Sequence, residues 1–484
     1  MNNQSLKSQA TSGIIWNAME KFSGQFIQLA VGIILARILV PADFGLIGML
    51  SIFIAISGAF VGSGLGSGLI QKKNRTDVDY TTVFIFNVAI SLLVYVILFF
   101  SAPLIADYYD EPRLTLLTRV LSLNIFINSF AIIQRTRLTV SMDFKSMAKV
   151  NVSAIIISGS FAVILALLDY GVWALVGQQL LNAVVAVTIL WVINKGIPPI
   201  RFSMQSFRRL FGFGSKLLIS RIYAQSLQNV YNITMGKYYS AGDLGYFTRA
   251  KTFSGMSSGL IAQVLQKVTY PLLSSIQDDK QRLVAVYSRM IKMAAFIVLP
   301  AMSLLALLAD PLIRLLLGEK WLGAIVLLQW LAIARITYPI SVINMNILNA
   351  VGRSDLFLKV DLIKAPIVIG ALWITIPISV EAMVIGQLVT SVIAFFINAY
   401  LPGKLFGYGP LNQLKDMVPY FLMTLGMGIS VFVVVCFIPY VVLKLVAGVV
   451  VGLLVYWALA EWKKVDELEE VKLVIEKIKN KIQR

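Results

Sequence analysis

The stretch ARILVPADFGL (Ala36–Leu46) decides the fold, because a related stretch, GKYYSAGDLGY (Gly236–Tyr246), follows about 200 residues later. Within these stretches, residues 200 positions apart match: Arg37 with Lys237, Asp43 with Asp243, and Gly45 with Gly245. Later in the chain the offset is about 210, and Lys149 matches Lys359 and Gly177 matches Gly386. A hydrophobic chain made of two such repeats is typical of transporters whose halves move about a site between them.

The composition indicates a membrane protein. The chain has 484 residues, of which 58% are hydrophobic and only 14% charged, and its mean hydropathy is +0.81. A membrane-spanning helix needs about 20 mostly apolar residues. Runs of this length predict an all-α integral membrane protein with about 14 transmembrane helices. Two pseudo-symmetric lobes of six helices are expected, followed by two extra C-terminal helices.

The repeat and the apolar runs divide the chain into five parts. We expect an N-terminal lobe at 1–194, a cytoplasmic connector at 195–212, a C-terminal lobe at 213–401, two further spans at 402–462 and an amphipathic cytoplasmic tail at 463–484. The tail carries apolar residues at alternating three- and four-residue spacing: Leu468, Val471, Ile475, Ile478 and Ile482. This pattern favours a helix on the inner membrane surface over a coiled-coil contact.

The net charge of +18 is distributed by side of the membrane. If every apolar run crosses the membrane, the loops around Lys72, Arg135 and Arg208 lie on one side and hold most of the basic residues. The loops on the other side of the membrane hold few basic residues. This asymmetry places both termini in the cytoplasm. The excess of basic residues is therefore explained by the orientation of the chain in the membrane and by attraction to anionic lipids. We expect no nucleic-acid partner.

The residue types present argue against an enzyme. Cys436 is the only cysteine and lies in an apolar run, and the chain has no histidine. Disulfides, thiol chemistry and the commonest metal ligand are thereby excluded. No catalytic constellation stands in a roomy external loop, so we expect a carrier without metal or cofactor. The first apolar run lacks a cleavage site and is interpreted as a retained span.

Two expected spans carry polar stripes. The first span has Asn17, Lys21, Gly24 and Gln28, with Glu20 beside them, and the seventh has Arg221, Gln225, Gln228 and Asn232. A charge at the bilayer centre costs about 2.5–3.5 kcal/mol on insertion scales, so neither stripe should face lipid. Lys21 and Arg221 are matched in the repeat and predict a shared central site. The alternative is that Lys21 snorkels to the surface or pairs with Glu20.

Further cations inside the expected spans suit an anionic substrate, because Arg offers phosphate a bidentate fork and Lys a point charge. The predicted substrate-binding residues are Lys21, Arg221, Arg335, Arg249, Lys251, Arg119, Gln25, Gln28, Gln225 and Gln228. Glu20 is the candidate for coupling to protons or sodium. Asp361 has Lys364 one turn away, so these two are expected to neutralise each other.

Four segments resemble a known family: ILARILVPADFGLIGM (Ile34–Met49), GLGSGLIQKKNRTDVDYTTVFIFN (Gly64–Asn87), APLIADYYDEPRL (Ala102–Leu114) and GVWALVGQ (Gly171–Gln178). They are similar to bacterial polysaccharide exporters of the Wzx type, in the multidrug/oligosaccharidyl-lipid/polysaccharide (MOP) flippase superfamily. Within it they resemble the subgroup that exports lipopolysaccharide, colanic acid and teichuronic acid.

The resemblance implies two helical lobes around a central cavity in the bacterial cytoplasmic (inner) membrane. It implies a flippase that moves an oligosaccharide on polyprenyl diphosphate to the outer leaflet by alternating access. Lipid-linked oligosaccharide, membrane lipids and polysaccharide assembly proteins are the implied partners of an expected monomer.

Two alternatives remain open. A multidrug antiporter of the same fold would need acids in the cavity, where cations dominate. A membrane-embedded glycan polymerase or ligase would need a large external loop.

The charge asymmetry generates a topology prediction. Loops around Lys72 and Arg208 should be cytoplasmic, and those around Asp110, Asp243 and Lys320 should face outward. Single cysteines placed in these loops can be labelled from outside intact cells with an impermeant thiol reagent. Strong external labelling at position 73 would overturn the arrangement.

Overall fold

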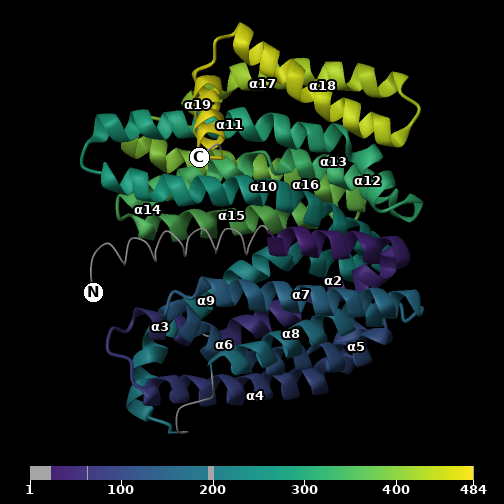
Figure 1. Cartoon of the computed structure of the whole chain (residues 1–484), viewed down its shortest axis with the longest axis vertical. Helices are drawn as coiled ribbons and strands as arrows, with labels where there is room; N and C mark the ends of the chain where they lie inside the picture. Colours follow the sequence, from purple (N-terminus) through teal and green to yellow (C-terminus); the bar gives the residue numbers. More distant parts are fainter. Residues whose placement is uncertain (1–22, 63, 195–200, 483–484) are drawn as a thin grey trace. The chain divides into compact units, whose positions relative to one another are not determined.

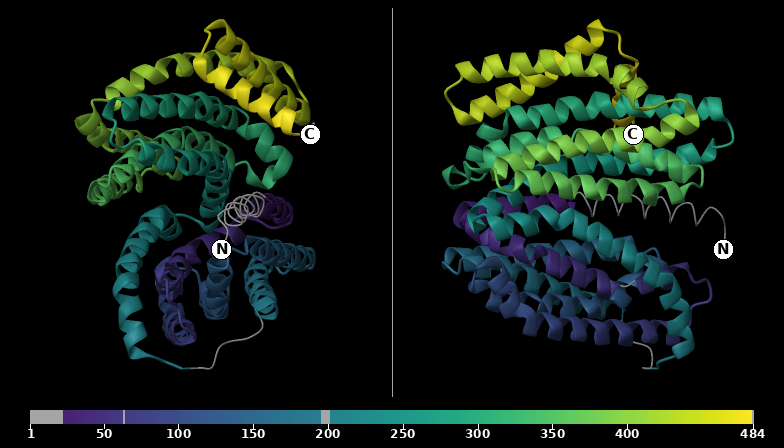
Figure 2. Two further views of the ribbon diagram at one scale, coloured as in Figure 1. Left: turned by 60° about the vertical axis from the view of Figure 1, so that its left-hand side comes forward. Right: turned by 180° about the vertical axis from the view of Figure 1, so that it is seen from behind.

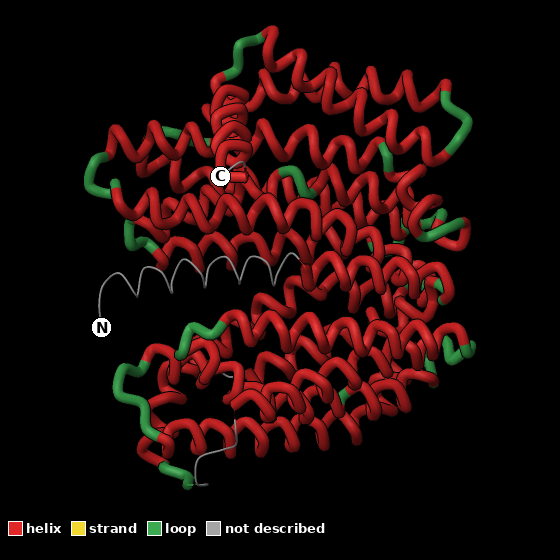
Figure 3. The backbone as a smooth tube through the Cα atoms, in the orientation of Figure 1, coloured by secondary structure: helices red, strands yellow, loops and turns green. Residues whose placement is uncertain are grey.

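The computed structural model describes residues 23–62, 64–194 and 201–482, and within these ranges every regular element is helical (Figure 3). Contacts divide the chain into two compact units, Met1–Gly245 and Tyr246–Arg484. This division falls after the first turn of α10 (Ala241–Ser275), so that one helix belongs to both units. The lobe boundary at 195–212 follows the sequence repeat and stays a prediction.

The described part of the first unit contains a helical segment at Ser23–Ile38 and eight further helices (Figure 1). These are α2 (Pro41–Gly62), α3 (Leu65–Gln71), α4 (Asp77–Tyr109), α5 (Arg113–Leu121), α6 (Leu123–Val140), α7 (Phe144–Leu167), α8 (Val172–Asn194) and α9 (Met204–Tyr238). The long helices pack in pairs, among them α7 with α8 and α2 with α9.

The second unit continues α10 and adds nine α-helices and one short 3₁₀ turn at Glu319–Trp321. The helices are α11 (Lys280–Leu307), α12 (Ala309–Leu316), α13 (Ala324–Ala334), α14 (Thr337–Ala350), α15 (Ser354–Thr375), α16 (Val380–Phe406), α17 (Pro410–Phe437), α18 (Val441–Trp462) and α19 (Asp466–Ile482). Helices α17 and α18, the expected extra pair, run side by side (Figure 2).

The all-α membrane fold is confirmed. Among the described residues, ten helical segments are long and apolar enough to cross a membrane. Helices α9, α10 and α15, where three more spans were expected, are 35, 35 and 22 residues long but more polar. The first expected span lies partly outside the described residues, so the predicted number of 14 is approximate. Large apolar side chains such as Trp373 (82% exposed) and Phe437 (83%) cover the surface, as hydrocarbon contact requires.

Side-chain caps fix where many helices begin. Thr76 and Asp79 form a capping box at the start of α4, where Lys72 also donates to Asp79 at 2.5 Å. Asp143 caps α7 and Asp279 caps α11, each accepting from a backbone N–H at 3.0 Å. Such caps satisfy backbone donors that the helix itself leaves unpaired.

The repeat is visible as a break in the fourth expected span of each half. In the first unit this span is α5 followed by α6, with Ser122 at the junction. In the second unit it is α13 followed by α14, with Arg335 and Ile336 at the junction. Each break places irregular backbone inside an apolar segment, which membrane proteins tolerate where protein or a cavity surrounds it.

The C-terminal tail is helical, as the apolar stripe predicted, but it starts against the protein. Leu468 is only 2% exposed and packs with residues of α11, α17 and α18, and Val471 packs beside it. Arg289 of α11 forms an ion pair with Glu470 of the tail. The expected contact with the membrane surface is therefore wrong for Leu468; the side chains of Ile475, Ile478 and Ile482 lie outside the described part.

A buried polar network attaches α17 to the second unit. Tyr287 of α11 donates to Asn344 Oδ1 of α14, and Gln413 Nε2 of α17 donates to the Tyr287 hydroxyl at 2.9 Å. Asn344 Nδ2 donates to Gln413 Oε1 at 3.1 Å. All three side chains are fully buried, so each depends on the other two for its hydrogen bonds.

Asn344→Ala should destabilise the second unit, because it leaves Tyr287 and Gln413 buried without a partner that both use. The expected cost is about 1–3 kcal/mol. Thermal unfolding in detergent should show a clearly lower midpoint than for wild type. Asn412→Ala, which removes one exposed hydrogen bond at the neighbour of Gln413 on α17, is the matched control. Equal midpoints for the two variants would contradict the role of the network.

Candidate functional site

Two of the predicted site residues lie outside the described part of the chain. These are Lys21, the predicted substrate cation of the first span, and Glu20, the predicted coupling residue. Their roles stay predictions. Further along the same segment, Gln25 is half-buried and its Oε1 has no hydrogen-bond partner among the described residues, while Gln28 is exposed.

The polar stripe of α9 faces α2 along part of its length. Ser51 of α2 donates to Asn229 Oδ1 at 3.2 Å and accepts from Asn232 Nδ2 at 3.0 Å. Asn229 in turn donates to the backbone carbonyl of Gln225 at 2.9 Å. Ser51 could not be predicted from the sequence, because it is one of two serines in a mostly apolar helix and nothing in the sequence distinguishes it from Ser57.

Arg221, the cation on this stripe, is exposed and lies near the end of α2. A Cβ atom added to Gly62 would stand 3.3 Å from Arg221 Nη1, so the glycine makes room for the guanidinium. Gln228 is exposed, and Gln225 is half-buried. The first unit therefore presents one accessible cation beside a row of amides.

Arg119 is bound to its own unit more closely than Arg221. Its Nε donates to the carbonyl of Phe99 at 3.3 Å, and its guanidinium carbon lies 4.6 Å from the centre of the Phe99 ring. Both contacts join α5 to α4. They support a packing role for this arginine.

The second unit holds three of the predicted residues on α10 and at the broken span. Arg335 stands at the α13–α14 junction, while Arg249 and Lys251 are half-buried on α10. A Cβ atom on Gly255, one turn after Lys251, would lie 3.9 Å from Arg335 Nη2. Because residues four apart lie on one face of a helix, Arg335 approaches the face of α10 that carries Lys251.

Aromatic rings accompany these cations. The Arg335 guanidinium lies 5.6 Å from the Tyr338 ring, and Lys251 Nζ lies 5.6 Å from the Phe247 ring. Within the described residues Arg335 forms no ion pair with a carboxylate. We define Lys251 and Arg335 as the cation cluster. Because like charges in an apolar segment are costly, this cluster favours binding of a multiply charged anion.

By contrast, the cation of α15 is neutralised within the protein. Lys364 Nζ lies 2.6 Å from Asp361 Oδ1 and donates to Asn398 Oδ1 at 3.1 Å. The predicted pairing of Asp361 with Lys364 is confirmed.

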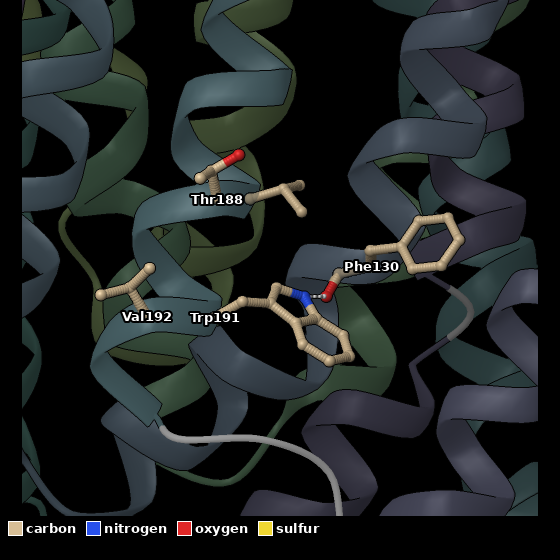
Figure 4. Close-up of a pocket in the computed structure, with 5 residues that line it drawn as sticks. Phe130, Thr188, Trp191 and Val192 are labelled. Carbon is tan, nitrogen blue, oxygen red and sulfur yellow. Dashed lines mark hydrogen bonds between the residues drawn. The ribbon is translucent and has the colours of Figure 1, made fainter.

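An apolar groove of about 550 Å³ lies elsewhere, between α6 and α8 of the first unit (Figure 4). It is lined by Phe130, Val187, Thr188, Trp191 and Val192. Trp191 Nε1 donates to the carbonyl of Phe130 at 3.1 Å and so fixes the indole at the groove. None of the predicted substrate-binding residues lines it.

Comparison with known proteins gives the family. A family model described as polysaccharide biosynthesis protein matches residues 34–326, which is more than half of the chain. The chain belongs to this family, and the resemblance found in its sequence is confirmed.

Two relatives and one solved structure match most of the chain. Teichuronic acid biosynthesis protein TuaB of Bacillus subtilis (strain 168) is 25% identical over 445 residues, covering 88% of this chain and 89% of TuaB. Succinoglycan biosynthesis transport protein ExoT of Rhizobium meliloti (strain 1021) is 26% identical over 455 residues, covering 93% and 92%. The inward closed structure of lipid II flippase MurJ superposes with a TM-score of 0.78 at 16% identity, covering 93% of this chain and 99% of MurJ. At this identity, MurJ shows the fold alone.

The contacts of Arg119 and Arg335 generate opposite expectations. Arg119→Ala should lower the unfolding temperature, because it removes contacts between α4 and α5, and should leave anion binding unchanged. Arg335→Ala should weaken anion binding and keep the unfolding temperature close to that of wild type. Thermal unfolding and binding of a lipid diphosphate, measured on the same purified samples, check both. The reverse pattern would contradict these assignments.

Proposed function

We propose that this chain is a flippase for an oligosaccharide linked to polyprenyl diphosphate. It moves this lipid from the cytoplasmic to the outer leaflet of the bacterial cytoplasmic membrane, for synthesis of a surface polysaccharide. The observation that carries the proposal is the cation cluster, in which Arg335, at the break between α13 and α14, approaches α10 at Gly255, one turn after Lys251. The relatives named for teichuronic acid synthesis and succinoglycan transport, and the MurJ-like fold, support it.

The chemistry of a diphosphate suits the cluster. Its charges offset the repulsion between Lys251 and Arg335, and its oxygens accept hydrogen bonds from a guanidinium fork and an ammonium. Such charge-assisted bonds strengthen in a poorly hydrated site. Tyr338 beside Arg335 offers a ring and a hydroxyl to the first sugars.

The remaining predicted residues complete the proposal. Arg221 and Lys21 act as further cations for the substrate. Hydrogen bonds to sugar hydroxyls come from the side-chain amides of Gln25, Gln28, Gln225 and Gln228. Glu20 couples transport to protons or sodium. The lobes alternate access about these groups, and both termini face the cytoplasm, as the loop charges favour. No chemical reaction is part of the proposal.

Removing charge from the cluster should impair binding and transport. Hydrogen bonds to charged groups contribute about 1.5–3 kcal/mol, so Lys251→Gln and Arg335→Gln should each weaken binding roughly ten- to a hundredfold. Lys251→Arg should retain more binding than Lys251→Gln. The measurement is binding and flipping of a fluorescent lipid-linked oligosaccharide by protein in proteoliposomes.

Lys267→Gln is the matched control, because Lys267 is an exposed cation on the same helix, α10. It should bind and flip like wild type. A double variant, Lys251→Gln/Arg335→Gln, that flips substrate at the wild-type rate would overturn the assignment of the cluster.

A further inference from the structure

A basic face is exposed where α9 begins, in the first compact unit. Arg208 and Arg209 are exposed in the second turn of the helix, and Arg201 is exposed just before it. Within the described residues, none of these three guanidinium groups forms an ion pair. The sequence from 170 to 242 contains no Asp or Glu, so no acid close in the chain offsets their charge.

The opposite face of the same turns is packed against the protein. Leu210 is only 4% exposed and belongs to a core cluster with residues of α3 and α4. The rings of Phe207 and Phe211 contact the Phe86 ring of α4, with centroids 5.0 and 6.1 Å apart. The start of α9 is therefore amphipathic, with its apolar side already occupied and its basic side free.

The segment that leads into α9 is fixed to the first turns of α4. Thr81 Oγ1 donates to the carbonyl of Arg201 at 2.7 Å, and the backbone N–H of Ser203 donates to Thr82 Oγ1 at 3.0 Å. Ser203 in turn caps α9 by accepting from the backbone N–H of Ser206 at 3.3 Å. The three arginines are thus presented on a rigid support, which limits the entropy lost when they bind a ligand.

The length of α9 places these arginines beyond the hydrocarbon. The helix has 35 residues and is about 50 Å long, whereas the hydrocarbon core is about 30 Å thick. Arg208 and Arg209 lie within its first six residues, at the end that the loop charges place in the cytoplasm. This end of the helix extends to the level of the lipid headgroups.

Large apolar side chains are exposed beside the arginines. Phe202 is 49% exposed and Met204 is 54% exposed. A surface for a soluble polyanion gains nothing from exposed apolar groups, whereas a membrane surface offers both anionic headgroups and hydrocarbon to such a segment. The combination therefore favours a lipid over a free anion.

We propose that this surface is a binding site for an anionic phospholipid of the cytoplasmic leaflet. The guanidinium groups donate to the headgroup phosphate, and the two apolar side chains contact the acyl chains. We call it the headgroup site, formed by Arg201, Phe202, Met204, Arg208 and Arg209. The bound lipid fixes the predicted connector between the two halves to the membrane surface. This inference is independent of the flippase function, because it involves none of the groups assigned to the transported substrate.

Removing two charges tests the site. Arg208→Gln/Arg209→Gln should weaken binding of dioleoylphosphatidylglycerol about twentyfold, because each basic residue near an anionic surface contributes about fivefold in affinity. Arg208→Lys/Arg209→Lys should retain most of the affinity. The measurement is native mass spectrometry of the purified full-length protein titrated with this lipid, with dioleoylphosphatidylcholine as the zwitterionic reference.

Lys280→Gln/Arg282→Gln is the matched control. These two exposed cations stand at the start of α11, also on the predicted cytoplasmic side, but directly after Asp278 and Asp279. The control removes the same charge and should bind phosphatidylglycerol like wild type. Equal affinities for wild type and the Arg208→Gln/Arg209→Gln variant, or equal losses in this variant and the control, would overturn the headgroup site.

Further measurements separate a lipid from a free phosphate, which offers the same oxygens. A large excess of inorganic phosphate should leave phosphatidylglycerol bound, and Phe202→Ser/Met204→Ser should weaken its binding although every charge is kept. Displacement of the lipid by inorganic phosphate, or wild-type affinity in the Phe202→Ser/Met204→Ser variant, would contradict the assignment to a lipid.

Discussion

The absence of water from the bilayer interior is the constraint on which the rest of this structure depends. Every backbone group in the spans needs a partner within the chain, and a helix supplies one for each residue. Polar side chains must then find partners across helices. Tyr287, Asn344 and Gln413 do so in a network that only three separate helices can complete.

The same constraint makes the cations informative. Lys364 is neutralised by Asp361, and Arg119 rests on a carbonyl and a ring, so their charges are explained by local structure. Lys251 lies one turn before Gly255, which Arg335 approaches, so two cations meet the same face of α10. In the proposed function, an anion that binds with the substrate offsets the cost of placing two cations there.

The fold could largely be predicted from the sequence, because length and hydropathy determine membrane helices and the shared register reveals the duplication. The pairing of Asp361 with Lys364 was predictable for a similar reason, since it is local to one helix. The contacts of Ser51 and Tyr338 could not be predicted, because they depend on where one helix crosses another and where a helix is broken. Arg119 shows the same limit: its residue type suggested substrate binding, but its contact with Phe99 arises only in the folded chain.

Duplication has preserved backbone geometry more faithfully than charge. Gly45 and Gly245 face carbonyls at matched positions, and both fourth spans are broken. Yet the junction of the first broken span is Ser122, with Arg119 one turn before it, whereas the junction of the second is Arg335 itself. Helix crossings require the same small residues in both halves, whereas the placing of a cation at a break is free to differ. The halves can therefore share their joints while their charges at the broken spans diverge.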